Sequence, residues 1–176
     1  MTMRRSAALL AGAALVLLAA TGCSDEPEVT PTSPPTSEPV ITAPEPDPTE
    51  EAEDAAIAAV EAFYDTEEQA GLSGDWTAEL WSQVAAGAAL EDRVSLGIDY
   101  TAAGWIFEGE IGVTDSTVDS LQLGPEPTVA VTSCIDRSTW ISPDGPGQPN
   151  LVTNTARAIN GTWMVVETAG NGASCP

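Results

Sequence analysis

The side chains that could do chemistry in this chain are few, and three of them are cysteines: Cys23, Cys134 and Cys175. A cysteine thiol can carry a lipid, pair with a second thiol in a disulfide, or bind zinc. The chain contains no histidine, which excludes histidine-based general bases, catalytic triads and metal sites. The first question is therefore which partner each thiol has.

Cys23 directly follows a segment with the organisation of an export signal. Arg4 and Arg5 precede an uncharged run of 14 residues, 7–20. As a helix this run would be about 21 Å long, short of the roughly 30 Å core of a bilayer. That length favours a signal peptide, 1–22, over a membrane-spanning helix.

The end of this segment, Ala20-Thr21-Gly22-Cys23, resembles a bacterial lipobox. Its small residues suit cleavage before Cys23, whose thiol would form a thioether with diacylglycerol. Several acyl chains, palmitate among them, make such an anchor stable where a single chain is marginal. We therefore predict a lipoprotein bound to the extracytoplasmic face of the cell membrane. The alternative is ordinary secretion, with Cys23 left as a free thiol.

The other two cysteines are predicted to pair. An odd number of cysteines in an exported protein needs an explanation, and a lipid on Cys23 leaves Cys134 and Cys175 in an oxidising compartment. A bridge between them would close a loop of about 40 residues, worth on the order of 3–4 kcal/mol in the chain-entropy model. The alternative is two buried free thiols.

The overall charge excludes some partners. The 176 residues include 27 acidic and 5 basic side chains, for a formal charge of −22. Nucleic acid needs clustered basic residues, and anionic lipid headgroups are disfavoured for the same reason. The only membrane contact that we expect is the lipid anchor.

A composition change separates a tether, 23–49, from a domain, 50–176. Residues 24–49 contain eight Pro, eight Ser or Thr and six acidic residues, a composition that predicts disorder. We interpret this segment as a spacer; a docking site for a Pro-recognising module and an O-glycosylated stalk are the alternatives. All nine aromatic residues lie between Phe63 and Trp163, so the core belongs to the domain.

The first part of the domain has helical periodicity. Acidic residues from Glu50 onwards suit the first turn of a helix, and an apolar stripe follows at three- and four-residue spacing, with Gly71 as the expected C-cap. Asp75 is expected to cap a second helix. A third helix is predicted over roughly 88–102. The apolar residues of the first two helices are Ile57, Val60, Phe63, Tyr64, Trp76, Leu80, Trp81 and Val84.

From Gly104 the period changes to two. Strands are predicted over 105–113, over 117–123 after a turn at 114–116, and over 128–137, the last continuing towards Ile141. Residues 143–147 form a loop by composition. Asn160-Gly161 is a strong signal for a two-residue hairpin between 151–159 and 163–166. The order indicates an α+β fold, with helices covering one face of a strongly curved antiparallel sheet of four to five strands.

This pattern resembles the nuclear transport factor 2-like (NTF2-like; cystatin-like, cone-shaped) superfamily, in particular small actinobacterial lipoproteins assigned to it. The residues that carry the resemblance are Ala62-Phe63-Tyr64, Ala102-Ala103-Gly104-Trp105, the run 133–138, the run 161–165 and Cys175. The resemblance covers 50–176. It implies a bent sheet around a conical pocket, and it implies little about function, because the fold hosts isomerases, dehydratases, transport factors and domains without known activity.

Enzymes with that fold, such as ketosteroid isomerases, combine a carboxylate base with a tyrosine and a neutral carboxylic acid in an apolar pocket. The candidates for such a pocket here are Asp99, Tyr100 and Asp136. Each has a structural alternative. Tyr100 could be a core aromatic with a wet hydroxyl, and Asp136 could pair with Arg137 or be solvated at a strand edge.

We predict no metal and no cofactor. Cys134 and Cys175 have no neighbouring zinc ligands, the run 115–119 is not a calcium-binding loop, and there is no phosphate-binding loop or nucleophile elbow. The leading hypothesis is a non-enzymatic surface lipoprotein that binds a small apolar ligand in a pocket or an envelope protein on its sheet. A structural or accessory envelope protein and an isomerase- or dehydratase-like enzyme are the alternatives.

Overall fold

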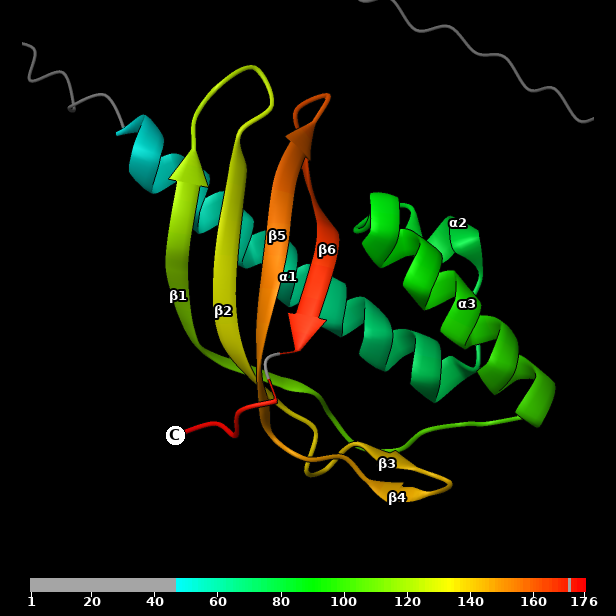
Figure 1. The fold of residues 1–176 in the computed structure, drawn as a ribbon. Coiled ribbons are helices and arrows are strands. Elements are labelled where there is room, and N and C mark those ends of the chain that lie inside the picture. The colour runs from blue at the N-terminus through cyan, green and yellow to red at the C-terminus, as the bar shows by residue number, and fades with distance from the viewer. Residues whose placement is uncertain (1–46, 171) are drawn as a thin grey trace, which may run out of the picture. The chain divides into compact units, whose positions relative to one another are not determined.

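The computed structural model describes residues 47–170 and 172–176. The predicted signal peptide, the lipidation site Cys23 and nearly all of the predicted tether lie outside the described residues. The described part is α+β, as predicted: helices at its N-terminal end pack on a four-stranded antiparallel sheet (Figure 1).

Helix α1, Pro48–Ser73, has 26 residues and crosses one face of the sheet (Figure 1). Asp47 caps it by accepting a hydrogen bond from the Thr49 N–H at 2.9 Å, and Pro48 suits the first turn because its missing N–H is not needed there. The predicted end at Gly71 is wrong. The helix continues to Ser73, and Gly74 takes the left-handed C-cap conformation with a φ of 73°.

The second predicted helix is much shorter than expected. Helix α2, Ala78–Trp81, is a single turn. Its N-cap residue is Thr77, not the expected Asp75, whose carboxylate accepts a hydrogen bond from the Thr77 N–H at 3.2 Å in the preceding loop. The third predicted helix is present as α3, Gly87–Ala103. It ends at Gly104, which has a φ of 67°.

The sheet has the strand order β1-β2-β5-β6. Two predictions about its first strand are wrong. Residues 105–111 are not a strand; they form a loop held by hydrogen bonds such as that from Phe107 N–H to the Gly71 carbonyl. The residues expected to turn at 114–116 lie within one strand, β1, Gly112–Gln122. A β-bulge occurs there, and Asp115 has a φ of 52°. The turn prediction failed because a residue with positive φ fits a bulge as well as a turn.

The later strands follow the prediction more closely. Strand β2 spans Thr128–Asp136, and the chain then turns, with Trp140 N–H donating to the Arg137 carbonyl, so the expected continuation to Ile141 is wrong. A small hairpin follows, made of β3, Ile141–Ser142, and β4, Gly145–Pro146.

The last hairpin has the predicted two-residue turn. Strands β5, Asn150–Ile159, and β6, Thr162–Gly170, flank it. Asn160 and Gly161 have φ values of 52° and 82°, the conformation that a tight hairpin of this kind requires.

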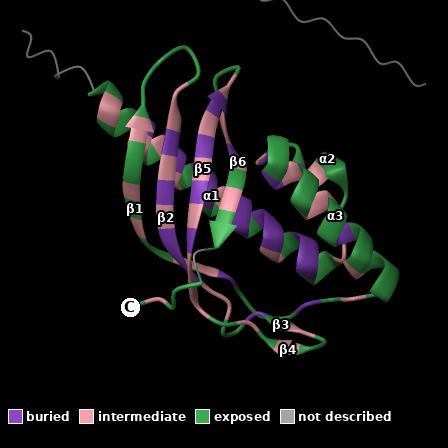
Figure 2. Cartoon of the chain, viewed as in Figure 1, coloured by how far each residue is buried: buried purple, intermediate pink, exposed green. Residues whose placement is uncertain are grey.

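The core lies between α1 and the sheet face that α1 covers (Figure 2). From the sheet, alternate residues point inward, and the fully buried ones include Val129, Val131 and Ile135 on β2 and Val165 on β6. From α1, Val60, Phe63 and Tyr64 meet them. Among the helices that the structure describes, none is long and apolar enough to cross a membrane.

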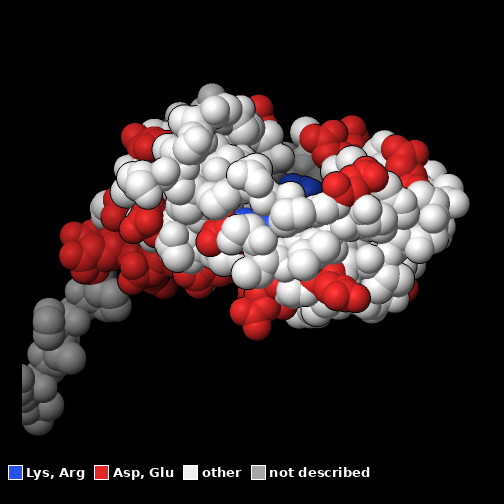
Figure 3. All heavy atoms as spheres, turned by 90° about the horizontal axis from the view of Figure 1, so that it is seen from below, with Lys and Arg blue, Asp and Glu red and all other residues white. Residues whose placement is uncertain are grey.

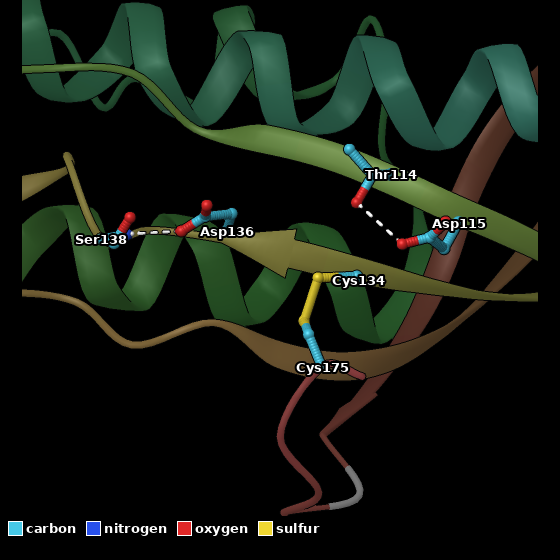
Figure 4. The surroundings of a disulfide bond; sticks show 6 residues. All are labelled: Thr114, Asp115, Cys134, Asp136, Ser138 and Cys175. Atoms are coloured by element: carbon cyan, nitrogen blue, oxygen red, sulfur yellow. Dashed lines mark hydrogen bonds between the residues drawn. A yellow bond between two sulfur atoms is a disulfide. The ribbon is translucent and has the colours of Figure 1, made fainter.

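Cys134 and Cys175 form the predicted disulfide (Figure 4). Their Cα atoms are 5.5 Å apart and the two residues are separated by 41 positions in sequence. Cys134 points to the sheet face opposite α1, because Ser133 and Ile135 on either side of it are buried beneath the helix. The bridge therefore ties the C-terminal residues across the outer face of β2.

Candidate functional site

A cavity of about 290 Å³ lies where the second half of α1, the end of α3, the loop 104–111 and the β3–β4 hairpin meet. Five aromatic side chains form much of its wall: Trp76, Tyr100, Trp105, Phe107 and Trp140. Glu67 and Arg137 supply charged groups, and Ser142 and residues 144–147, with the charged Asp144 among them, complete the rim. Aromatic walls with a few polar groups are the usual composition of a small-molecule site.

Two helical glycines allow two of the tryptophans to reach this wall. A Cβ atom on Gly71 would lie only 2.3 Å from Cζ2 of Trp140, so the indole ring packs directly against the α1 backbone. A Cβ atom on Gly97 would lie 2.4 Å from the Cβ atom of Trp76. Both positions therefore need glycine for close packing, and both glycines contribute to the shape of the cavity.

The aromatic rings form a connected set of edge-on and stacked pairs. Tyr100 and Trp105 are stacked with an interplanar angle of 14°, and Phe107 and Trp140 are stacked at 15°. An edge-to-face contact between Tyr100 and Phe107, with centroids 5.2 Å apart, joins the two stacks. Such pairs hold one another in place, so the wall is arranged before any ligand enters.

The charged end of the cavity is built around Glu67, a buried carboxylate on α1 that is 7% exposed. Its Oε2 atom lies 2.9 Å from Nη2 of Arg137, which follows β2, and its Oε1 atom lies 3.2 Å from Nη1 of Arg93 on α3. Each guanidinium also lies over an aromatic ring: that of Arg93 over Phe63 and that of Arg137 over Tyr64. Glu67, Arg93 and Arg137 are referred to below as the Glu67 cluster.

The Glu67 cluster carries an excess positive charge, since two guanidinium groups share one carboxylate. Burial alone would lower the pKa of Arg137, but the Glu67 carboxylate and Tyr64 together more than offset this effect, and the pKa of the guanidinium is raised. Both arginines are therefore charged. On the face seen in Figure 3, arginine atoms lie within a recess and most acidic atoms lie around the outside. The Glu67 cluster thus has a formal charge of +1 within an acidic protein.

A second polar contact lies beside the cluster, inside the core. The Tyr64 hydroxyl donates a hydrogen bond to Oδ1 of Asn154 on β5 at 3.2 Å. Burial, and then the charge of Glu67, raise the pKa of Tyr64, so its phenol is neutral at physiological pH. Tyr64 therefore supports Arg137 as an uncharged aromatic surface.

The structure separates the three residues that the sequence nominated for a pocket. Tyr100 lines the cavity, and burial followed by the Glu67 charge raises the pKa of its phenol. Asp99 is exposed on α3 and does not line the cavity. The cavity therefore combines Tyr100 with Glu67, not with Asp99.

Asp136 belongs to a local turn. Its Oδ1 atom accepts a hydrogen bond from the Ser138 N–H at 2.8 Å (Figure 4), and this bond lowers the pKa of the carboxyl group. Its neighbour Arg137 points the opposite way, into the cavity. Asp136 therefore does not line the cavity, and the alternative of an ion pair with Arg137 is wrong as well, because Arg137 pairs with Glu67.

Sequence reasoning missed the Glu67 cluster, although one signal for it was present. Val60, Phe63 and Glu67 recur at spacings of three and four, so an acidic residue stands where the buried stripe of α1 continues. A carboxylate at such a position needs a cationic partner. Its partners could not be read from the sequence, because Arg137 lies 70 positions away.

Comparison with known proteins gives similarity in fold only. No protein family model and no curated protein matches the chain. Among solved structures, the intermembrane space region of the chloroplast protein ARC6 is similar with a TM-score of 0.46 and 15% identity, over 72% of this chain and 98% of that one.

Two bacterial structures are similar as well. An uncharacterised protein with a cystatin-like fold from Caulobacter vibrioides has a TM-score of 0.38 and 14% identity, over 68% of this chain and 88% of that one. An NTF2-like protein with a cystatin-like fold from Novosphingobium aromaticivorans has a TM-score of 0.33 and 18% identity, over 72% and 92%.

Within residues 47–170 and 172–176, no three His, Cys, Asp or Glu side chains are grouped so that they could hold a metal ion.

Proposed function

We propose that the chain is an exported lipoprotein, held at the cell membrane through Cys23, whose folded domain binds a small apolar ligand without transforming it. The observation that carries the binding function is the aromatic wall of the cavity beside Arg137. Five aromatic side chains around about 290 Å³ match a ligand of one or two rings, since ligand pockets range from roughly 300 to 1,000 Å³.

The membrane part of the proposal is supported by the sequence. A positively charged start, an apolar run too short to span a bilayer and a lipobox-like ending precede Cys23. The disulfide between Cys134 and Cys175 uses the other two thiols of the chain. Pairing of these two residues fits export to an oxidising compartment.

A binding function without catalysis fits the polar groups of the cavity. Each oxygen of Glu67, the carboxylate nearest Tyr100 in the wall, is held in an ion pair with a guanidinium group, so this side chain serves to fix Arg93 and Arg137 in place. Asp99, the carboxylate that the sequence placed beside Tyr100 as a candidate, is exposed and does not line the cavity. The remaining lining groups suit contact and orientation.

The cavity is a better candidate than the outer sheet face. Two threonines at the centre of that face, Thr132 and Thr153, already have hydrogen-bonded hydroxyls. Thr132 and Thr153 are 2.7 Å apart between their Oγ1 atoms, and the Thr132 hydroxyl also lies 2.6 Å from Oδ2 of Asp119. Groups that are satisfied in this way offer little to a partner.

The proposal is tested by titrating the full chain, in mild detergent, with indole and with naphthalene, and by following tryptophan fluorescence and heat. Trp105→Ala should weaken binding at least tenfold, because Trp105 lines the cavity. Trp163→Ala is the matched control, since Trp163 is similarly half-buried but does not line this cavity. Equal losses in both variants, or no binding of either compound to the unmodified chain, would refute a ligand site here.

A further inference from the structure

We infer that the cavity selects a small planar aromatic carboxylate, with the carboxylate bound by Arg137 and the ring held among Tyr100, Trp105 and Trp140. This inference rests on the proposed binding function and specifies its ligand. It follows from three features: the charge of the Glu67 cluster, the donors of Arg137 and the arrangement of the rings.

The charge balance of the Glu67 cluster calls for one more negative group. Arg93 and Arg137 each carry one positive charge, and Glu67 carries one negative charge. One positive charge is therefore not balanced within the cluster. The side chains of Arg93 and Arg137 are only 13% and 19% exposed. The two guanidinium groups therefore share a single counter-charge in a site where charge is poorly solvated, and a monoanionic ligand would balance the second one.

Arg137 has the geometry to receive that anion. A guanidinium carries five N–H donors in a planar fork. Glu67 takes one of them, on Nη2, and the Tyr64 hydroxyl interacts with the same group, which leaves the fork with more donors than these partners use. Of the two arginines, Arg137 alone lines the cavity. A carboxylate matches such a fork because it accepts two parallel hydrogen bonds.

The carboxylates of the protein itself are poorly placed to supply the negative charge that would balance the Glu67 cluster. Both oxygens of Glu67 are engaged. Asp144 stands at the rim, exposed on the β3–β4 turn, where water screens its charge. Within the described part of the chain, both ion pairs are made to Glu67, and neither involves Asp144.

The rings favour a planar ligand over a bulky one. Trp105 stacks on Tyr100 and Trp140 stacks on Phe107, each pair within 15° of parallel. Flat aromatic faces pack well against another ring. Such faces also attract cations, so a cationic aromatic ligand is the competing possibility that an experiment must distinguish.

Three indole derivatives of nearly equal size separate these possibilities: indole-3-acetate, indole-3-acetamide and tryptamine, which are anionic, neutral and cationic at pH 7. The full chain in mild detergent is titrated with each by calorimetry, with empty micelles as the blank. We expect the acetate to bind at least about tenfold more tightly than the amide, since hydrogen bonds to charged groups are markedly stronger, and tryptamine to bind most weakly.

Arg137→Gln should abolish the preference for the acetate over the amide while indole itself still binds. Arg157→Gln is the matched control: it removes the same charge from β5, at a position that does not line the cavity, and should leave the preference intact. Asp144→Asn should strengthen acetate binding about two- to threefold, because it removes a like charge from the rim.

The outcomes distinguish this inference from the function on which it rests. Equal affinity for the acetate and the amide, or tighter binding of tryptamine, would overturn the carboxylate assignment and leave an apolar binding site in place. Failure of all three derivatives and of indole would overturn both. Loss of the preference in Arg157→Gln as well as in Arg137→Gln would show that overall charge, not Arg137, selects the ligand.

Discussion

The Glu67 carboxylate lies 2.9 Å from the Arg137 guanidinium, so that a single ion pair joins the second half of α1 to the residue that follows β2. The same carboxylate also holds Arg93 of α3. Three elements that are distant in sequence are thus fixed relative to one another at the charged end of the cavity. Under the proposal above, stability and ligand selectivity would depend on the same carboxylate.

Replacing Glu67 by Gln should destabilise the protein by about 3 kcal/mol, because it leaves two buried guanidinium groups without their counter-charge. Chemical denaturation of the unmodified and variant chains measures the loss. Glu61→Gln is the control, since Glu61 lies on the same helix but is exposed, and it should change stability by no more than about 0.5 kcal/mol. Equal effects of the two substitutions would mean that the cluster contributes nothing beyond ordinary surface charge.

Gly71→Ala should cost about 1–2 kcal/mol and weaken indole binding. The added methyl group would overlap Trp140, and overpacking of this kind costs about 1–3 kcal/mol, partly offset by the better helix propensity of alanine. Gly124→Ala is the control, because an added Cβ atom there meets no heavy atom within 4 Å. Denaturation and indole titration on both variants test the prediction; unchanged affinity in the Gly71→Ala variant would contradict the packing argument.

Elements with a strong local pattern could be predicted from the sequence. The apolar stripe that contains Val60 and Phe63 indicates the covered face of α1, and Asn160-Gly161 indicates the last hairpin; both are present. The turn predicted at 114–116 failed for a physical reason. A residue with positive φ, such as Asp115, is equally suited to a tight turn and to a bulge within a strand, and only pairing with β2 decides between them.

The cavity could be predicted only in part. Tyr100 was nominated and does line it, but its partners are set by tertiary packing. Trp140 reaches the wall because the chain turns back after β2 and because Gly71 leaves room for its ring. Neither condition has a local sequence pattern, so the sequence could nominate Tyr100 but could not show that its neighbours in the wall include Trp140 and Glu67.

Removing the disulfide with Cys134→Ser and Cys175→Ser together should destabilise the folded domain by about 2–4 kcal/mol, the usual range for a bridge that closes a loop of this order. The backbone hydrogen bond from Leu151 N–H to the Ala173 carbonyl lies in the segment that the bridge fastens. Amide exchange at Leu151 should therefore become faster. Reductant should lower the melting temperature of the unmodified chain but not that of the double variant; the same shift in both would contradict the prediction.

Replacing Cys23 by Ser should release the protein from the membrane into the medium, because the predicted thioether cannot form on a hydroxyl. Fractionation of expressing bacteria, followed by detergent phase partitioning, measures the distribution. The Cys134→Ser, Cys175→Ser variant is the matched control, since it removes thiols but keeps the proposed lipid site, and it should remain with the membrane. A Cys23→Ser variant that still enters the detergent phase would show that Cys23 is not the anchor.

Ionisation of the Tyr64 phenol should lower the stability of the protein at high pH. Burial, together with the charge of Glu67, raises the pKa of its phenol in the folded state above the ordinary value of 10.0. Between the two pKa values the unfolded chain binds fewer protons than the folded one, so the free energy of unfolding decreases as the pH rises. This contribution is fully present below about pH 10 and is lost as the pH passes through the raised pKa.

Tyr64→Phe tests the assignment. It removes the ionisable group and the hydrogen bond to Asn154, so it should lower stability at neutral pH by about 1–3 kcal/mol and flatten the decline above pH 10. Tyr100→Phe must be measured beside it, because burial also raises the pKa of Tyr100. Denaturation curves collected between pH 8 and 11 give the slopes. If the Tyr64→Phe variant declines as steeply as the unmodified chain while the Tyr100→Phe variant is flat, the alkaline sensitivity belongs to the cavity tyrosine and not to the one beside Arg137.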